Sequence, residues 1–227
     1  MNYTLIILGI LLVLVIYILY KVISEKGKSV TNKLNSLDSN PDWPYSTATR
    51  PNSSRYFLSW WVYVVQQNST SNTIFDIKTD ATTRVKVTLY DTGTMKYSLY
   101  DSGANSLQEH TLATNLPYQK WVYCVLSVDN NVVDVYIDGK MIRSQRMNYK
   151  PSHPDKDYKI VFGHTSGTDE FHLAKMERVP QPVDPTLAWN KYMEGNGGSY
   201  FSRILSNYGA SFTITKDDLD VRKFDLL

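Results

Sequence analysis

The stretch "WVYCVLSVDNNVVDVYIDGKMI", Trp121–Ile142, decides the fold, because it reads as two β-hairpins laid end to end. Apolar residues recur at every second position on either side of a turn at Asp129-Asn130-Asn131: Val122, Cys124, Leu126, Val128, Val133, Val135 and Ile137. This period of two is the pattern of strands that bury one face. Asp138-Gly139 turns the chain again, because glycine takes the positive φ that a tight hairpin needs.

The residues on either side of this stretch repeat the strand pattern. Tyr56–Gln66 is an almost continuous apolar run of strand length, which predicts a central strand. Thr73–Ile77 and Lys159–Gly163 are also of strand length. Two runs around Asp91-Thr92-Gly93 alternate, with these residues on their inward faces: Val85, Val87, Leu89, Met95, Tyr97 and Leu99. Short strands separated by turn signals predict a mainly β protein, an antiparallel sandwich or jelly roll.

The C-terminal quarter of the chain has a different pattern. Asp184-Pro185 predicts the start of a helix, because the aspartate can cap it and proline suits its first position. Gly195 is placed to end that helix. Ser199–Gly209 predicts a second short helix, and Ser211–Phe224 a closing hairpin.

An uncharged apolar run, Leu5–Tyr20, opens the chain. With its flanking residues it reaches about 20 residues, enough to cross a hydrocarbon core of roughly 30 Å. No lysine or arginine precedes the run and no small-residue cleavage site closes it, which argues against a signal peptide. We therefore expect a retained transmembrane anchor over residues 1–23, represented by Leu5, Ile10, Val15, Tyr20 and Lys21.

The flanks of the run predict its orientation. Lys21, Lys26 and Lys28 follow it and nothing basic precedes it, so the positive-inside rule places the C-terminal domain in the cytoplasm. Three N-glycosylation sequons would matter only on a lumenal segment: Asn2, Asn52 and Asn68.

Composition suggests four regions in order along the chain. The anchor at 1–23 is followed at 24–55 by a segment rich in Ser, Thr, Asn and Pro, which predicts an extended linker or a surface-hugging strap. The sandwich occupies 56–183, and 184–227 holds the C-terminal helices and the closing hairpin. We expect the domain without residues 1–50 to be soluble.

Charge and cysteine content exclude some classes of function. The net charge of +2 is too small for a nucleic-acid partner. Cys124 is the single cysteine, so no intramolecular disulfide can form, and its place on an apolar strand face predicts a small buried hydrophobe. No cofactor-binding motif and no metal-ligand spacing of histidines occurs, so we expect no cofactor and no metal.

Several of these segments together resemble the concanavalin A-like lectin/glucanase superfamily, in its laminin-G-like form. The resemblance covers roughly residues 55–180 and lies in these segments: Phe57–Val62, Trp121-Val122, Val135–Lys140 and Ile160–Gly163. Trp189–Gly198 is similar, more narrowly, to membrane-anchored proteins of this fold in nucleocytoplasmic large DNA viruses. That resemblance implies a virion component between an internal membrane and an icosahedral capsid.

The glucanases of this superfamily carry an E-x-D-x-x-E strand motif, whose two glutamates are the nucleophile and the acid/base. The five glutamates of this chain make no such spacing: Glu25, Glu109, Glu170, Glu177 and Glu194. We therefore expect no catalytic residues and no enzyme. Lectin sites use aspartate and asparagine on loops, and the candidates by type are all interpreted as turn residues: Asp76, Asp91, Asp101, Asp129 and Asn130.

The sequence thus favours a non-enzymatic, membrane-anchored structural protein, a minor capsid or virion component that tethers an internal membrane to the capsid shell. Its partners would be the lipid bilayer and capsid or other virion proteins, with a glycan less favoured. Exposed aromatic residues are the candidate partner-binding surface: Tyr90, Tyr100, Trp189 and Tyr192. The alternative is a lectin-like receptor domain on a membrane anchor, which binds a glycan or a protein.

Overall fold

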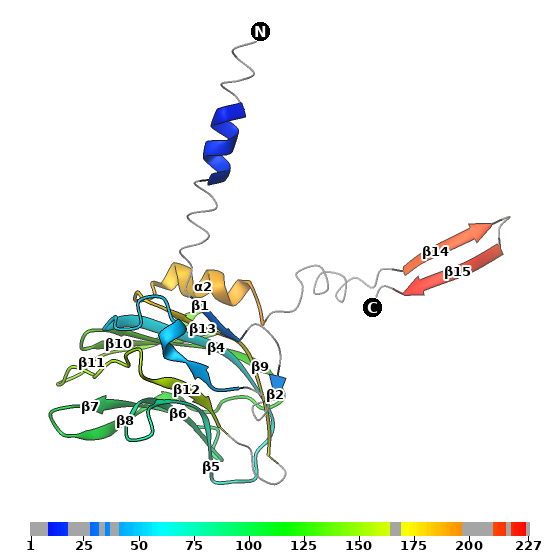
Figure 1. The fold of residues 1–227 in the computed structure, drawn as a ribbon. Helices are drawn as coiled ribbons and strands as arrows, with labels where there is room; N and C mark the ends of the chain where they lie inside the picture. The colour runs from blue at the N-terminus through cyan, green and yellow to red at the C-terminus, as the bar shows by residue number, and fades with distance from the viewer. Residues whose placement is uncertain are drawn as a thin grey trace.

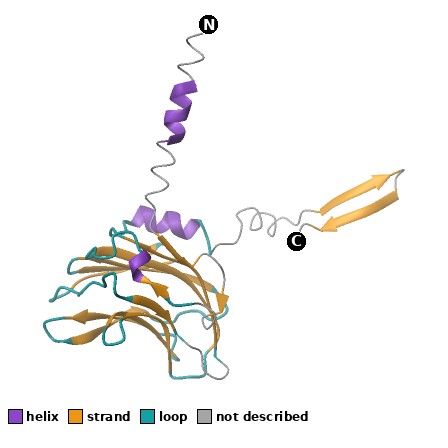
Figure 2. Cartoon of the chain, in the orientation of Figure 1, coloured by secondary structure: helices purple, strands orange, loops and turns teal. Residues whose placement is uncertain are grey.

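The computed structural model is a sandwich of two antiparallel sheets with few helices (Figures 1 and 2). It describes residues 9–17, 28–31, 35–36, 41–163, 169–196, 211–216 and 219–225. The seven-stranded sheet has the order β1-β13-β4-β9-β10-β11, with β2 also paired to β13. Its strands are β1 (Lys28–Thr31), β2 (Asn35–Ser36), β4 (Arg55–Gln66), β9 (Trp121–Asp129), β10 (Val132–Ile137), β11 (Lys140–Arg146) and β13 (Glu170–Val179).

The six-stranded sheet faces it, in the order β3-β12-β5-β6-β7-β8. Its strands are β3 (Trp43–Pro44), β5 (Ser71–Lys78), β6 (Thr83–Tyr90), β7 (Met95–Asp101), β8 (Ser106–Ala113) and β12 (Lys159–Phe162). The 3-10 helix η2 (Tyr45–Thr47) follows β3, and helix α2 (Pro185–Met193) lies across the outer face of the seven-stranded sheet (Figure 1). Strands β14 (Ser211–Lys216) and β15 (Leu219–Asp225) form the predicted closing hairpin.

The two hairpins of Trp121–Ile142 are confirmed. In the first, Val133 pairs with Val128, Val135 with Leu126 and Ile137 with Cys124. The second turns at Asp138 (φ 48°) and Gly139 (φ 76°), the left-handed backbone that its Asp-Gly dipeptide predicts. One irregularity in the register lies between Val135 and Tyr136, where β10 meets β11.

The main core lies between the sheets and draws apolar side chains from both. Trp60 of β4 meets Phe75 of β5 edge to face, with ring centroids 5.0 Å apart. The six residues predicted to face inward on β6 and β7 are all fully buried, and so is Cys124. β4 pairs with both β13 and β9, so the predicted central strand is confirmed.

A second, smaller core lies on the other face of the seven-stranded sheet. Its members come from four strands, from α2 and from the segment that leads into it: Phe57, Trp61, Tyr123, Val125, Tyr136, Ala174, Val179, Val183 and Ala188. Tyr192 of α2 stacks on Trp61, with ring centroids 5.6 Å apart and planes 19° apart. The sheet therefore buries apolar side chains on both faces, which explains why β4 and β9 are apolar almost throughout.

Helix α2 begins and ends where the sequence predicts. The side chain of Asp184 accepts a hydrogen bond of 2.8 Å from the backbone N–H of Leu187, and Pro185 occupies the first turn. Gly195 follows the helix with φ 73° and donates its N–H to the carbonyl of Tyr192. The second predicted helix, Ser199–Gly209, lies outside the described residues.

The predicted linker contributes strands to both sheets. β1 and β2 pair with β13, and β3 pairs with β12. Tyr45 of η2 is fully buried in the main core. The described parts of residues 24–55 are therefore a strap bound to the sandwich, because Tyr45 fills space that neither sheet fills alone.

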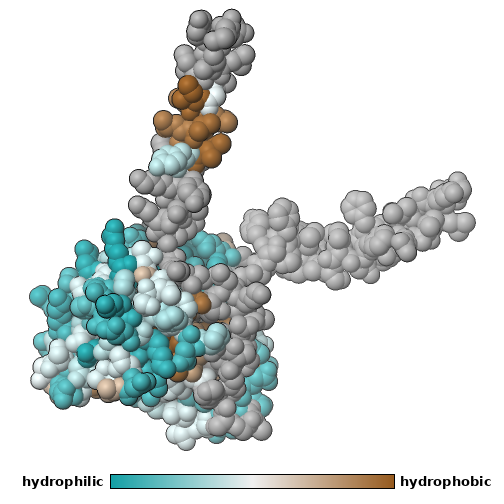
Figure 3. All heavy atoms as spheres, viewed as in Figure 1, coloured by the Kyte–Doolittle hydropathy of each residue, from teal (hydrophilic) through white to brown (hydrophobic). Residues whose placement is uncertain are grey.

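The described part of the apolar N-terminal run is a helix over residues 9–17. Ile10 and Val15 belong to it and are 63% and 46% exposed, within an apolar surface that Figure 3 shows in brown. No helix among the described residues has the length and apolar character needed to cross a membrane. Leu5, Tyr20 and Lys21 lie outside the described residues, so the anchor stays a prediction.

Candidate functional site

The predicted partner-binding residues do not form one surface. Tyr90 and Tyr100 lie on the outer face of the six-stranded sheet, at the alternate positions to its buried residues. Trp189 and Tyr192 lie on α2, which covers the outer face of the opposite sheet. Because the two sheets stack face to face, these pairs lie on opposite sides of the molecule.

The tyrosines of the six-stranded sheet have polar partners of their own. Tyr90 donates a hydrogen bond of 2.8 Å from its hydroxyl to Glu109, and the ammonium of Lys96 lies 4.6 Å from the centre of the Tyr90 ring. The guanidinium of Arg84 lies 4.4 Å from the centre of the Tyr100 ring. Both rings are therefore parts of local cation–π contacts.

A polar cavity of about 430 Å³ lies where β5 turns into β6, beside the start of β12. Apart from Ala81 and Val161, its wall is made of residues with hydroxyl, carboxylate and ammonium groups: Asp76, Lys78, Thr79, Asp80, Thr82, Thr83 and Lys159. Lys159 at its rim forms an ion pair with Asp42, with a nitrogen–oxygen distance of 3.0 Å.

The turn between β5 and β6 holds the threonine hydroxyls in place. The backbone N–H of Thr79 donates to the carbonyl of Thr82 at 2.8 Å. The Thr79 hydroxyl accepts from the N–H groups of Ala81 and Thr82 at 3.3 and 3.1 Å. Such side-chain to backbone bonds stabilise tight turns, so this rim of the cavity is preorganised.

Asp76 is a carboxylate of the cavity wall with one hydrogen-bonded oxygen and one that has no donor in the described chain. Its Oδ2 accepts a hydrogen bond of 3.1 Å from the hydroxyl of Thr83. Its Oδ1 is buried and has no hydrogen-bond partner within the described parts of the chain. Burial raises the pKa of the carboxyl, against the opposing effects of the Thr83 hydrogen bond and of Lys78 and Lys86. A buried acceptor without a partner costs about 1–3 kcal/mol, so a donor added at the cavity would stabilise Asp76.

Aromatic side chains continue the site along the same sheet. The hydroxyls of Thr82 and Tyr158 lie 2.9 Å apart, and the guanidinium of Arg84 lies 5.5 Å from the centre of the Tyr158 ring. Arg84 also reaches Tyr100, so the predicted Tyr100 is joined to Thr82 of the cavity through three contacts, by way of Arg84 and Tyr158. The Nε of Arg84 is a second buried polar atom with no hydrogen-bond partner in the described chain.

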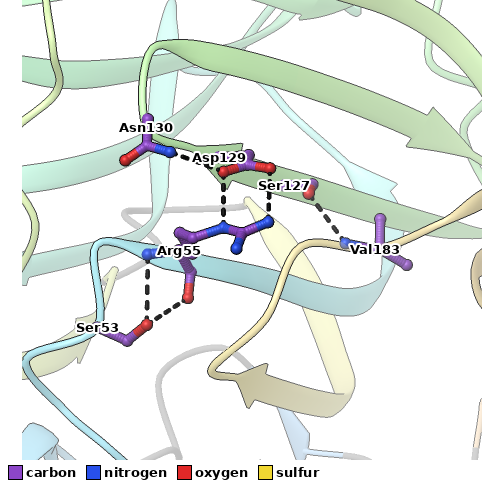
Figure 4. A network of polar contacts seen from close by, with 6 residues as sticks. All are labelled: Ser53, Arg55, Ser127, Asp129, Asn130 and Val183. Carbon is purple, nitrogen blue, oxygen red and sulfur yellow. Dashed lines mark hydrogen bonds and ion pairs between the residues drawn. The ribbon is translucent and has the colours of Figure 1, made fainter.

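Most of the other predicted sugar-binding residues have local structural roles. Asp129 and Arg55 form a bidentate ion pair at 2.7 and 3.0 Å, and Asn130 donates to the same carboxylate at 3.0 Å (Figure 4). Asp101 accepts from the N–H of Gly103 at 2.8 Å, as turn chemistry predicts. Asp91 donates its own N–H to the carbonyl of Thr70, which extends the pairing of β6 with β5 by one residue.

Asp76 differs from these residues because it lies within β5 and not at a turn, so the interpretation as a turn residue was wrong for it. An aspartate inside a strand is disfavoured by propensity. That mismatch was a signal in the sequence that could have marked Asp76 as unusual.

Nucleophiles and metal ligands do not converge in the described chain. It holds no group of three or more His, Cys, Asp or Glu side chains placed to bind a metal ion. His172 pairs with Glu170 at 3.1 Å, and His110 shares a 3.1 Å hydrogen bond with Tyr149. Burial raises the pKa of the Cys124 thiol, so the thiolate that nucleophilic chemistry needs is disfavoured.

Comparison with protein families gives a match over residues 40–180, to the family model described as the concanavalin A-like lectin/glucanases superfamily. No curated protein matches the chain.

Solved structures share the fold at low sequence identity. The binding domain of botulinum neurotoxin serotype D matches with a TM-score of 0.58 at 11% identity, over 75% of this chain and 52% of that one. The binding domain of Paraclostridial Mosquitocidal Protein 1 matches with a TM-score of 0.56 at 10% identity, over 74% and 45%.

A serotype D ligand-binding domain solved in complex with N-acetylneuraminic acid matches with a TM-score of 0.58 at 12% identity, over 75% of this chain and 51% of that one. The chain thus spans about half the length of these solved chains, and at such identity the likeness shows the fold alone.

Proposed function

Because the chain belongs to the concanavalin A-like lectin/glucanase superfamily, we propose that it is a non-catalytic binding module, held at a membrane by its N-terminal apolar run. Its ligand is a saccharide, and the polar cavity at the turn between β5 and β6 is the binding site. This reverses the preference of the sequence-based expectation, which placed a capsid tether ahead of a lectin-like receptor domain. The capsid partner stays a prediction.

The observation that carries this proposal is that one carboxylate oxygen of Asp76 has no hydrogen-bond donor in the described chain. Its Oδ1 is buried at the cavity wall without a donor among the described residues, next to the hydroxyls of Thr83 and its neighbours. A sugar offers hydroxyl donors and acceptors at close spacing, so one hydroxyl can donate to the Asp76 carboxylate when the side chain turns Oδ1 toward the cavity. A neighbouring hydroxyl of the sugar can then bind Thr79 or Thr82.

The solved neighbours support a binding role through their fold. They are binding domains, and one was solved in complex with N-acetylneuraminic acid. This is an analogy between folds, and the ligand class for this chain rests on the cavity itself.

The cavity does not resemble a glycosidase site. Such an enzyme needs two carboxyl groups at a fixed separation around the scissile bond, and the chain has no E-x-D-x-x-E motif. Asp80 is the second carboxylate at the cavity, and it is exposed on a turn. The arrangement supports recognition of hydroxyl groups and not hydrolysis.

A glycan array tests the proposal with the full chain in detergent micelles. We expect binding to a defined set of saccharides, and Asp76→Asn should weaken that binding by at least about tenfold, because a charged acceptor is lost. Asp101→Asn is the matched control, since Asp101 lies on the same sheet but bonds within its own turn. Binding to no saccharide, or equal loss in both variants, would contradict the proposal.

A further inference from the structure

An apolar patch is exposed on the side of the sandwich that carries α2. We define the α2 patch as Trp189 and Met193 of α2 with Met141 of β11, whose exposed fractions are 43%, 54% and 44%. Trp189 and Met193 are four residues apart and share one flank of the helix. Met141 is the register partner of Tyr136, a member of the second core, so both lie on the face that α2 covers.

Close packing holds the patch together. A Cβ on Gly139, in the turn between β10 and β11, would come within 3.0 Å of the Trp189 ring and of Tyr192. Trp189 and Tyr192 are themselves in contact, with ring centroids 5.5 Å apart. Trp189 is therefore packed between the turn and Tyr192 while 43% of it stays exposed.

We propose that the α2 patch docks against the surface of the lipid bilayer in which the N-terminal run is anchored. The inference rests on the anchor in the proposed function, and it adds an orientation of the sandwich on the membrane. The predicted anchor belongs to the same chain, so it would place a lipid surface near this side of the molecule.

The short connection between the predicted anchor and β1 favours the lipid bilayer as the surface that covers the patch. The predicted anchor ends at residue 23 and β1 begins at Lys28. Five residue steps span at most about 18 Å even when fully extended. The sandwich is thus held close to the point where the chain leaves the bilayer, and one of its faces must lie near the lipid.

The pairing of β1 shows which face that is. Lys28 and Ser29 are the register partners of Arg178 and Glu177 on β13. Glu177 forms an ion pair with Lys191 of α2. The chain therefore enters the sandwich beside α2, and not beside the six-stranded sheet with its polar cavity.

The chemistry of this side suits a lipid headgroup region. Tryptophan prefers the interface between water and hydrocarbon, because its ring is apolar and its N–H is polar. Arg146 of β11 is exposed, and its register partner Val132 lies on the same face of the sheet as Tyr136 and Met141. A basic residue on this side attracts anionic lipids.

The single buried cysteine makes a clean labelling experiment possible. Met141→Cys would carry an environment-sensitive fluorophore within the patch, while buried Cys124 stays unlabelled. Leu107→Cys is the matched control, since Leu107 is 38% exposed on β8 of the opposite sheet. The full chain is reconstituted into phosphatidylcholine–phosphatidylserine vesicles that contain a lipid-borne quencher.

We expect the fluorescence of the label at position 141 to be quenched and shifted to the blue, and the fluorescence at position 107 to be unchanged. Adding Trp189→Ser should make both effects at position 141 smaller. Equal signals at the two positions in vesicles that retain the chain would overturn the docking and leave the anchor intact. A chain that does not co-float with the vesicles would overturn the anchor itself, and the docking with it. Protection of position 141 in detergent alone, rising with protein concentration, would show that a second copy covers the patch.

Discussion

At the scale of single residues, Arg178 shows how the strap is fixed to the sandwich. It is fully buried, and neutral groups hold it: the Tyr45 hydroxyl and the Thr49 carbonyl at 2.7 Å each, and the Pro51 carbonyl at 3.4 Å. The rings of Tyr45 and Tyr56 lie 5.1 and 5.5 Å from the guanidinium carbon. A buried charge is costly unless its donors are satisfied, so these bonds make the strap essential.

Removing one hydroxyl tests this role of Arg178. Tyr45→Phe should lower the free energy of unfolding by about 1.5–3 kcal/mol, because the Arg178 Nε loses its acceptor. Tyr56→Phe should not lower it, since the buried Tyr56 hydroxyl has no hydrogen-bond partner in the described chain. Urea unfolding of the full chain in detergent measures both. Similar losses in the two variants would mean that ring packing holds the strap and the hydrogen bond does not.

Asp169 gives the fold a specific sensitivity to acid. Burial raises the pKa of its carboxyl, but hydrogen bonds from the Ser69 hydroxyl, the Asn72 amide and two backbone N–H groups outweigh burial and lower it to about 2. A folded-state pKa below the unfolded value of 3.8 stabilises the fold above pH 4, and this stabilisation is lost as the pH falls toward 2.

Unfolding measured from pH 6 to pH 2 tests this effect. Asp169→Asn should be less stable than the natural chain near neutral pH, and the difference should shrink below pH 4. A difference that stays constant across this range would show that the Asp169 charge is not the cause.

At the scale of elements, the alternation in Trp121–Ile142 was enough to predict the hairpins, and Asp184-Pro185 with Gly195 was enough to predict α2. The second core could not be predicted, because an alternating pattern identifies one buried face of a strand and does not show what covers the opposite face. Tyr123 and Val125 were its signal, since two adjacent apolar sets on β9 require a cover on both faces. The strap was one of two alternatives that composition offered for residues 24–55, but its pairing with both sheets could not be predicted, because β1, β2 and β3 are too short for a periodic pattern.

Truncation tests the strap at this scale. Removal of residues 1–27 should leave a soluble, cooperatively unfolding domain, because β1 and everything after it remain. Removal of residues 1–50 should abolish cooperative unfolding, since it deletes the fully buried Tyr45 and the Thr49 carbonyl that Arg178 requires. This revises the expectation that the shorter fragment is soluble. Circular dichroism and limited proteolysis would detect the difference, and two equally stable fragments would contradict it.

At the scale of the whole molecule, the proposed ligand and the charges beside the predicted anchor favour opposite sides of the membrane for the domain. A saccharide site is most useful outside the cytoplasm, where glycans are displayed, whereas Lys21, Lys26 and Lys28 predict the cytoplasmic side. Asn52 and Asn68 are both exposed, so each can accept a glycan if the domain is lumenal.

The charge bias predicts that both sites remain unmodified in a eukaryotic host cell. A glycosidase-sensitive mass shift that disappears in Asn52→Gln/Asn68→Gln would reverse the orientation and leave the cavity as described. This measurement therefore determines on which side of the membrane the domain lies, independently of the ligand that it binds.

The candidate site was the least predictable part of the molecule. The sequence offered several aspartates of the right type but could not rank them, because it does not show which of them are satisfied by local turns or by distant strands. Asp129 is satisfied by Arg55, from a strand 74 residues earlier in the sequence, and only the folded structure reveals that Asp76 keeps one oxygen unpartnered within the described chain.

The most direct test of the central claim is to locate a bound saccharide in solution. The full chain, labelled at its threonine methyl groups, is titrated with the strongest saccharide from the array and followed by NMR. We expect the signals of Thr79, Thr82 and Thr83 to shift together, while Thr92 and Thr186, which lie outside the cavity, stay unchanged. Shifts confined to other threonines, or an unchanged spectrum with every saccharide tried, would contradict the assignment of the cavity as the ligand site.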